Sequence, residues 1–238
     1  ILALWLIPGL GPRRIYRIVD QFKPIETVFR ESPARLSDQL RIDISIAHQI
    51  PHARESKVFD RELKLISDFG LDILDFTQAE YPVLLKETVN APPIMYVRGN
   101  VDFNLGLPIG FVGSRKASFY GKNMCHKLIK RMAQINPNTI ILSGLALGID
   151  SAAHKAALDF GLKTVAVLAG GLSSIYPTQN RNLAKSIETN GALITEFPVK
   201  SKPIAINFPL RNRIISGMSK GVVIVESGSR SGASITAG

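Results

Sequence analysis

The sequence predicts an α/β protein whose mostly parallel sheet is covered by helices on both faces and follows a small all-α region. Three observations lead to this prediction. From Gly110 onward, short apolar runs alternate with helical segments. These runs are continuous, which is typical of parallel strands buried on both faces. Before about residue 80, by contrast, apolar residues recur at helical spacing.

Residues 1–78 are expected to form a separate helical domain. Leu2 to Ile7 and Ile15 to Phe22 are predicted helices on either side of a Pro-Gly-Leu-Gly-Pro turn. The arrangement resembles a helix-hairpin-helix module, in which backbone N–H groups of the hairpin hold a DNA phosphate. Pro12 has no N–H group, however, and the region has no positive excess. Phosphate binding and a structural or partner-binding role both stay open for this hairpin.

Helical spacing and apolar runs also predict the remaining elements of this domain and those of the second domain. More helix is predicted over residues 33–69, with starts at Ser32-Pro33 and Ser37-Asp38, and a short strand from Asp72 to Phe76. The second domain is expected to occupy residues 79–238. Its strands are predicted at residues 92–100, 109–112, 139–142, 164–168, 192–195 and 221–226. Its helices are predicted at residues 122–133, 150–158 and 180–189, and from near Arg211.

Composition narrows the class of protein. Cys125 is the single cysteine, so no internal disulfide can form and a reducing compartment is favoured. The apolar start is interrupted by Pro8 and Gly9 with no basic residue before it, which argues against a signal peptide or membrane span. A cytosolic protein is expected. The chain lacks an initiator Met and ends in Ser-Gly-Ala-Ser-Ile-Thr-Ala-Gly, which resembles the first turn of an unfinished helix, so natural sequence is expected beyond both ends.

The positive charge is concentrated in the second domain. Residues 1–80 hold 11 basic and 12 acidic residues, whereas residues 81–238 hold 18 and 7, a net charge of +11. Charge alone indicates non-specific attraction, and many basic proteins are merely soluble. Because the excess coincides with the glycine-rich sheet region, a polyanion is the favoured partner.

Two predicted strands end in glycine and serine just before a helix. Gly113-Ser114-Arg115-Lys116 follows one strand, and Ser143-Gly144 follows the next. At the carboxyl edge of a parallel sheet, glycine lets a ligand approach the backbone and the next helix begins with unpaired N–H groups. These residues are therefore candidate phosphate ligands, with a structural ion pair as the alternative for Arg115. Ser231-Gly232 opens the last predicted helix and is a third candidate of this kind.

A third group of candidates combines an aromatic ring with two arginines. Asn207-Phe208 precedes Arg211 and Arg213 where a helix is predicted to begin. Stacking of a base on an aromatic ring beside a guanidinium is how single strands are held without sequence preference. The two arginines are two residues apart, so a helix would place them on nearly opposite faces. One is expected to contact the ligand and the other to support the fold, and Phe208 can equally be a core residue.

Familiar catalytic and cofactor motifs are absent from the sequence. The region around Gly113 has one glycine where the dinucleotide motif needs three, and no P-loop occurs. The four histidines are scattered, so neither a metal site nor a catalytic residue is predicted. Asp150 is predicted as a helix N-cap with His154 one turn later, and capping is favoured over an acid–base pair.

Taken together, these stretches resemble the DNA-processing protein A family, called DprA or Smf, and the resemblance covers residues 81–238 almost continuously. The matching motifs are Tyr81-Pro82-x-Leu84-Leu85, Pro92-Pro93, Arg98-Gly99, Val112-Gly113-Ser114-Arg115, Ser143-Gly144-x-Ala146-x-Gly148-Ile149-Asp150-x-x-Ala153-His154, Tyr176-Pro177-x-x-Asn180, Phe208-Pro209-x-Arg211-Asn212-Arg213 and Glu226-Ser227 with Ser231-Gly232-Ala233.

The resemblance implies an extended Rossmann-like fold and a homodimer without catalytic activity. It implies that the protein binds single-stranded DNA without sequence preference, protects it, and loads RecA onto it in place of single-strand-binding protein during natural transformation and recombination. Some relatives carry a DNA-binding lysine shortly before the aromatic residue, where this sequence has Ala205 and Ile206.

The main alternative is an enzyme similar to Rossmann-type nucleotide phosphoribohydrolases of the lysine-decarboxylase-like kind. Those enzymes carry Pro-Gly-Gly-x-Gly-Thr and a catalytic glutamate after the last strand. Here the stretch that begins at Glu226 lacks the proline, the Gly-Thr pair and the downstream acid. A structural protein whose crevice binds nothing is a third reading.

Overall fold

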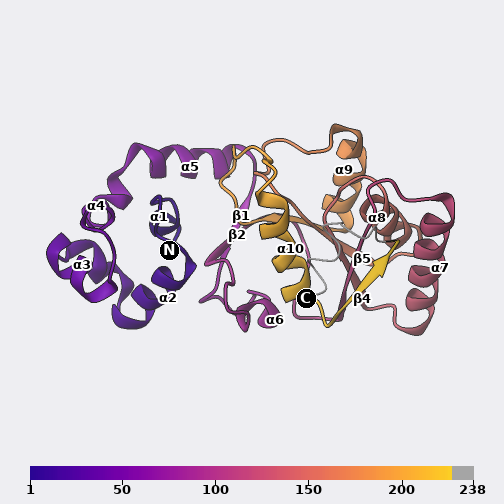
Figure 1. The fold of residues 1–238 in the computed structure, drawn as a ribbon, viewed down its shortest axis with the longest axis horizontal. Coiled ribbons are helices and arrows are strands. Elements are labelled where there is room, and N and C mark those ends of the chain that lie inside the picture. The colour runs from indigo at the N-terminus through magenta and orange to yellow at the C-terminus, as the bar shows by residue number, and fades with distance from the viewer. Residues whose placement is uncertain (227–238) are drawn as a thin grey trace.

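The computed structural model describes residues 1–226, and helices form the part of the chain that comes first. Helices α1 to α5 form one end of the elongated molecule (Figure 1). Their bounds, with two short 3₁₀ helices, are α1 Leu2–Trp5, α2 Pro12–Gln21, η1 Ile25–Arg30, α3 Pro33–Leu40, α4 Ile44–Ala47, η2 Ala53–Glu55 and α5 Lys57–Asp68. The helix–turn–helix arrangement predicted at the N-terminus corresponds to α1 and α2.

Side-chain caps explain where several of these helices begin. The Ser32 hydroxyl accepts a hydrogen bond from Arg35 N, and Pro33 occupies the first helical position of α3, as predicted. The second predicted start, Ser37-Asp38, is wrong because both residues lie inside α3, which ends at Leu40 and is followed by Arg41 in the left-handed region. The next helices are capped by Asp43 and Ser56 instead.

The sheet of the described region has seven strands in the order β1-β2-β6-β5-β4-β3-β7. The strands are β1 Asp72–Asp75, β2 Ile94–Gly99, β3 Leu107–Gly113, β4 Thr139–Ser143, β5 Lys163–Val167, β6 Gly191–Thr195 and β7 Gly221–Val225. Strands β6, β5, β4, β3 and β7 pair in parallel, whereas β2 runs antiparallel to both β1 and β6. This confirms the predicted mostly parallel α/β fold.

Helices cover both faces of the sheet. Their bounds are α6 Val83–Lys86, α7 Phe119–Ile135, α8 Ile149–Asp159, η3 Thr178–Asn180, α9 Arg181–Asn190 and α10 Asn207–Met218. On one face, Cys125 of α7 and Ala153 of α8 share a core with Phe111 of β3. On the other, Ile214 of α10 packs in a core with Val112, the next residue of β3. Neighbouring strand residues thus serve opposite faces.

Two predicted helix starts need correction. The helix expected from near Arg211 begins at Asn207, which places Phe208 and Pro209 in its first turn. Asp150 is not the N-cap of α8, because the helix begins at Ile149 after Gly148 and Asp150 lies in its first turn. The carboxylate instead accepts hydrogen bonds from backbone N–H groups of the preceding loop.

The helical end packs directly against the sheet. Trp5 Nε1 donates to the backbone oxygen of Glu196, and the Glu62 carboxylate of α5 accepts from Val199 N at 2.7 Å. Apolar residues of α1 to α4 also belong to the same core as Ile214 of α10. Strand β1 lies before residue 79 and joins the sheet. A domain boundary at residue 78 therefore stays a prediction. Within residues 1–226, no helix has the length and apolarity needed to cross a membrane.

Candidate nucleic-acid interface

A crevice lies where the carboxyl ends of β3, β4 and β5 meet the start of α10. Strand β3 has β4 on one side and β7 on the other, so the connections diverge here, as they do at the ligand site of doubly wound sheets. The crevice is lined by Arg115, Gly144, Ala146, Leu147, Leu168, Ala169, Gly170, Ser174, Tyr176, Pro177, Pro203 and Phe208. Candidate residues from three separate stretches of sequence therefore meet at one edge of the sheet.

The loop after β3, residues 113–116, exposes its basic side chains. A side chain at Gly113 would overlap Ile149 of α8 and the backbone of β7, which explains the glycine. Ser114 is held by its backbone: its N–H donates to Glu226 O at 2.9 Å and its carbonyl accepts from Ile149 N at 3.1 Å. Its hydroxyl accepts from Lys116 N. This rigid support leaves the side chains of Arg115 and Lys116 exposed.

Arg115 lies over an aromatic ring at the edge of the crevice. Its guanidinium carbon is 4.9 Å from the centroid of the Phe208 ring, within range of a cation–π contact. The edge of Phe208 in turn meets Tyr176, with 6.2 Å between ring centroids. Phe208 is half-buried and Tyr176 is exposed. A cation and two rings thus face the same opening.

The loop after β4, residues 143–148, has its polar groups turned inward. The Ser143 hydroxyl is fully buried and donates to Phe111 O at 2.7 Å. The N–H groups of Gly144 and Ala146 donate to the Asp150 carboxylate. A side chain at Gly144 would overlap the guanidinium of Arg211. Ser143 is therefore a structural residue here, whereas Gly144 lines the crevice through its backbone.

The two arginines of α10 point to opposite sides, as their spacing predicts. Arg211 is 4% exposed and donates to the carbonyl of Val167 at the end of β5. Burial lowers the pKa of Arg211 and raises that of Asp150, and the attraction between their charges opposes both shifts. Arg211 thus lies beneath the crevice, where it joins β4, β5 and α10.

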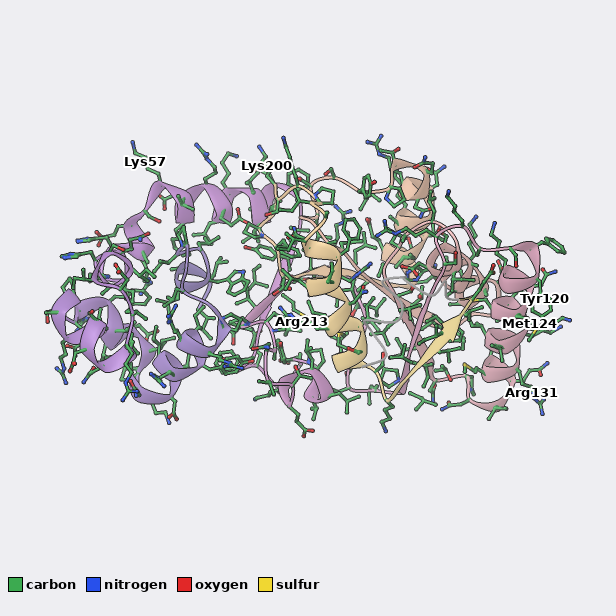
Figure 2. The ribbon with its side chains drawn as sticks, viewed as in Figure 1. Lys57, Tyr120, Met124, Arg131, Lys200 and Arg213 are labelled. Atoms are coloured by element: carbon green, nitrogen blue, oxygen red, sulfur yellow. The ribbon has the colours of Figure 1, made fainter. Side chains whose placement is uncertain are left out.

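Arg213 lies on the other side of α10, toward the helical end of the molecule (Figure 2). It donates to Asn90 O and forms an ion pair with the buried Glu196, whose backbone oxygen also accepts from Trp5. The structure therefore does not bring Arg213 to the crevice. Asn207 is also buried, and its side-chain amide donates to Ala169 O, which fixes the start of α10 to the end of β5.

The N-terminus of α7 is occupied by an internal carboxylate. Glu226, directly after β7, accepts hydrogen bonds from the backbone N–H and the hydroxyl of Ser118, and that hydroxyl accepts from Gly121 N. In many Rossmann-like proteins, this first helix N-terminus holds a nucleotide phosphate. Here the protein supplies its own anion. The remaining candidates, Ser231 and Gly232, lie outside the described residues.

Several crevice residues were not predicted. Tyr176 appears in the sequence only as part of a family motif, and Leu147, Gly170 and Pro203 carry no sequence signal of exposure toward a ligand. The side-chain amide of Asn180, by contrast, has a clear structural role, because it donates to Leu145 O at 2.8 Å and so holds the loop after β4. A lone asparagine after Tyr-Pro offers no indication of that distant partner.

The side chain of His154 is hydrogen bonded to Thr164. Its Nδ1 is 2.7 Å from the hydroxyl of Thr164, which itself donates to Ile141 O. Because that hydroxyl proton is already donated, Nδ1 carries the proton in the His154–Thr164 bond. Burial lowers the pKa of His154 to about 3. The ring is thus a neutral core residue, consistent with the preference for a structural role over an acid–base pair.

Comparisons with known proteins agree with this arrangement. The sequence model described as DNA recombination-mediator protein A matches residues 72–238. The chain is 34% identical over 243 residues to Protein Smf of Synechocystis, an alignment that covers 99% of this chain and 61% of that protein. It is 44% identical over 158 residues to Protein Smf of Escherichia coli, which covers 66% of this chain and 42% of that protein.

Two solved structures extend the comparison to the fold. DNA processing protein A from Streptococcus pneumoniae has a TM-score of 0.83 at 30% identity, covering 99% of this chain and 80% of that one. A structure that concerns the single-stranded DNA binding mode of DNA processing protein A from Helicobacter pylori has a TM-score of 0.64 at 28% identity, covering 72% and 76%.

The chain spans 61% of the length of the Synechocystis relative and 42% of the length of the Escherichia coli relative. Its family match nonetheless extends over most of its length and includes every strand of the sheet. The chain therefore belongs to the DNA recombination-mediator protein A family.

Proposed function

We propose that the crevice binds single-stranded DNA without sequence preference. The observation that carries the proposal is the exposed Arg115 guanidinium lying on the Phe208 ring, with Tyr176 beside it at the same opening. A guanidinium can bind a phosphate through two hydrogen bonds while the adjacent rings stack on bases. Neither contact depends on which base is present.

Charge supports the same proposal. The net charge of +11 on residues 81–238 belongs to the part of the chain that forms the crevice. Arg115 is exposed at its opening and the neighbouring Lys116 is exposed as well. Arg211 is buried beneath the crevice and contributes positive potential rather than a direct contact. The roles assigned to Gly113 and Ser114 are then indirect, since they position Arg115. Asn207 positions Phe208 by fixing the start of α10. Arg213 supports the opposite side of α10 through its ion pair with Glu196.

In the whole protein, we infer a non-enzymatic role in recombination: a homodimer that protects incoming single strands and loads RecA onto them as single-strand-binding protein is displaced. The family description as a recombination mediator supports this role. The single-stranded DNA binding mode with which the Helicobacter pylori structure is concerned supports the choice of ligand.

The test is a gel-shift titration of Arg115→Ala against single- and double-stranded oligonucleotides over a range of salt concentrations. We expect Arg115→Ala to weaken single-strand binding by about 1–3 kcal/mol and to flatten the slope of log affinity against log salt by roughly 0.7. The matched control is Arg61→Ala, an exposed arginine on α5 at the helical end.

Unchanged affinity and an unchanged slope for Arg115→Ala would remove Arg115 from the site. The enzyme alternative has its own readout, because a phosphoribohydrolase would release free base from nucleoside monophosphates. An idle crevice would leave the wild-type protein unable to retain oligonucleotides even at low salt.

A further inference from the structure

Helix α7 carries two large aromatic side chains in an unusual place. Phe119 is 81% exposed and Tyr120 is 74% exposed, and both lie in the first turn of the helix. The core side of α7 is formed instead by Gly121, Cys125 and Ile129. Neither ring contributes to the hydrophobic cores of the described region. Packing within the described fold therefore does not explain why these two positions are aromatic.

The outer face of the same helix is basic. Its sequence, Phe-Tyr-Gly-Lys-Asn-Met-Cys-His-Lys-Leu-Ile-Lys-Arg-Met-Ala-Gln-Ile, contains no acidic residue. At 3.6 residues per turn, the exposed Lys127, Lys130 and Arg131 fall on the same outward face as the two rings. Figure 2 shows Tyr120 and Arg131 along the outer side of α7, at the end of the molecule opposite Lys57.

Acidic groups near α7 do not neutralise this face. Glu226 is hydrogen bonded to Ser118 at the N-terminus of the helix. Asp159, at the end of α8, lies 3.6 Å from His126. Within the described residues, no ion pair is formed by Lys127, Lys130 or Arg131. The three charges are therefore available to an anionic partner.

The start of α7 follows shortly after Arg115 in the sequence. Phe119 follows Arg115 by four residues, and the exposed Lys116 lies between them. Lys116, the two exposed rings and the basic side chains of α7 therefore follow Arg115 in order along the chain. Aromatic rings next to a line of positive charge are the combination that holds unpaired nucleotides.

We propose that the outer face of α7 is a second binding segment for the same single strand. Bases that leave the crevice stack on Phe119 and Tyr120, and the following phosphates lie along Lys127, Lys130 and Arg131. This inference rests on the proposed function of the crevice, and it extends the number of nucleotides that one chain holds.

The experiment compares two oligothymidylates, one of about 5 nucleotides that fills only the crevice and one of about 20 that reaches α7. Two variants are needed: Phe119→Ala with Tyr120→Ala, and Lys127→Gln with Lys130→Gln and Arg131→Gln. We expect both to bind the short strand like the wild type. The aromatic variant should bind the long strand about tenfold more weakly or worse. The charge variant should lower the salt slope on the long strand by about 2.

The matched control removes three exposed charges from the opposite end, by Lys57→Gln with Arg61→Gln and Lys64→Gln on α5. It should bind both strands normally, and all variants should keep the wild-type Tm. Wild-type binding of the long strand by both α7 variants overturns the proposal, and so does an equal loss on both strands. If the wild-type protein binds neither strand, the crevice proposal fails first; if it binds both equally well, only the α7 segment fails.

Discussion

The loops after β3 and β4 are alike in sequence but use their polar groups in opposite ways. Each begins with glycine and serine and leads into a helix. In the β3 loop, the backbone groups of Ser114 form hydrogen bonds with Glu226 and Ile149, and the side chain of Arg115 stays exposed. In the β4 loop, the Ser143 hydroxyl donates to Phe111 O, and two backbone N–H groups donate to the Asp150 carboxylate. One loop presents a binding group, and the other builds the support beneath it.

The position of α10 explains this difference. Arg211 extends from α10 to the end of β5 and packs against Gly144, so a buried charged side chain lies beneath the β4 loop. Its N–H groups then need an internal acceptor, which Asp150 provides. Arg115, by contrast, contacts the Phe208 ring on one side and stays exposed to solvent. The support and the binding surface should therefore respond differently to mutation.

The largest expected effect is on stability, at the buried centre of the β4 loop. Asp150→Ala should lower the free energy of unfolding by about 3 kcal/mol or more, because it leaves the buried Arg211 charge uncompensated and two backbone N–H groups without their acceptor. Urea denaturation followed by circular dichroism measures this change.

Two further variants make this prediction specific. Asp150→Asn keeps an acceptor oxygen but removes the charge, so its loss of stability should be smaller than that of the alanine variant. Asp159→Ala removes an exposed carboxylate from the end of the same helix and should change stability by less than about 0.5 kcal/mol. Equal stability of Asp150→Ala and Asp159→Ala would show that the β4 loop does not depend on this carboxylate.

A smaller effect, on binding rather than stability, is expected at the α10 ring that contacts Arg115 of the β3 loop. Phe208→Ala should weaken single-strand binding by about 1–3 kcal/mol, because it removes both a stacking surface and the ring beneath Arg115. Phe208 is uncharged, so the salt slope should stay at the wild-type value, unlike that of Arg115→Ala. Fluorescence anisotropy at several salt concentrations separates the two variants.

The control for this prediction is Phe208→Trp, which keeps an aromatic face and should restore most of the affinity. Leu210→Ala changes an exposed apolar residue of the same helix that does not line the crevice, and it should bind normally. An affinity of Phe208→Ala equal to that of the wild type would mean that Phe208 only packs against the fold.

Local patterns predicted the elements of this fold well, because short-range forces set them. Continuous apolar runs and helical spacing gave all the strands of the sheet and most of its helices. They could not show that Ser143 faces Phe111, or that Arg211 lies beneath Gly144, since these contacts join residues that are far apart in the chain. The expectation that one of the two arginines of α10 supports the fold came from helical geometry. The structure gives both arginines internal partners, since Arg211 is buried against Val167 O and the partly exposed Arg213 forms an ion pair with Glu196.

The smallest expected effect is at Ser143, where the sequence pattern suggests phosphate binding but the structure shows a buried hydroxyl. The residue matches the phosphate-binding pattern as well as Ser114 does, but its hydroxyl is fully buried and donates to Phe111 O. Ser143→Ala should therefore cost about 1 kcal/mol of stability, the value of one buried hydrogen bond, and leave single-strand affinity unchanged. Chemical denaturation and an oligonucleotide titration of the same preparation measure both quantities. A variant with wild-type stability and weakened binding would place the Ser143 hydroxyl at the ligand, and the contrast between the two loops would then disappear.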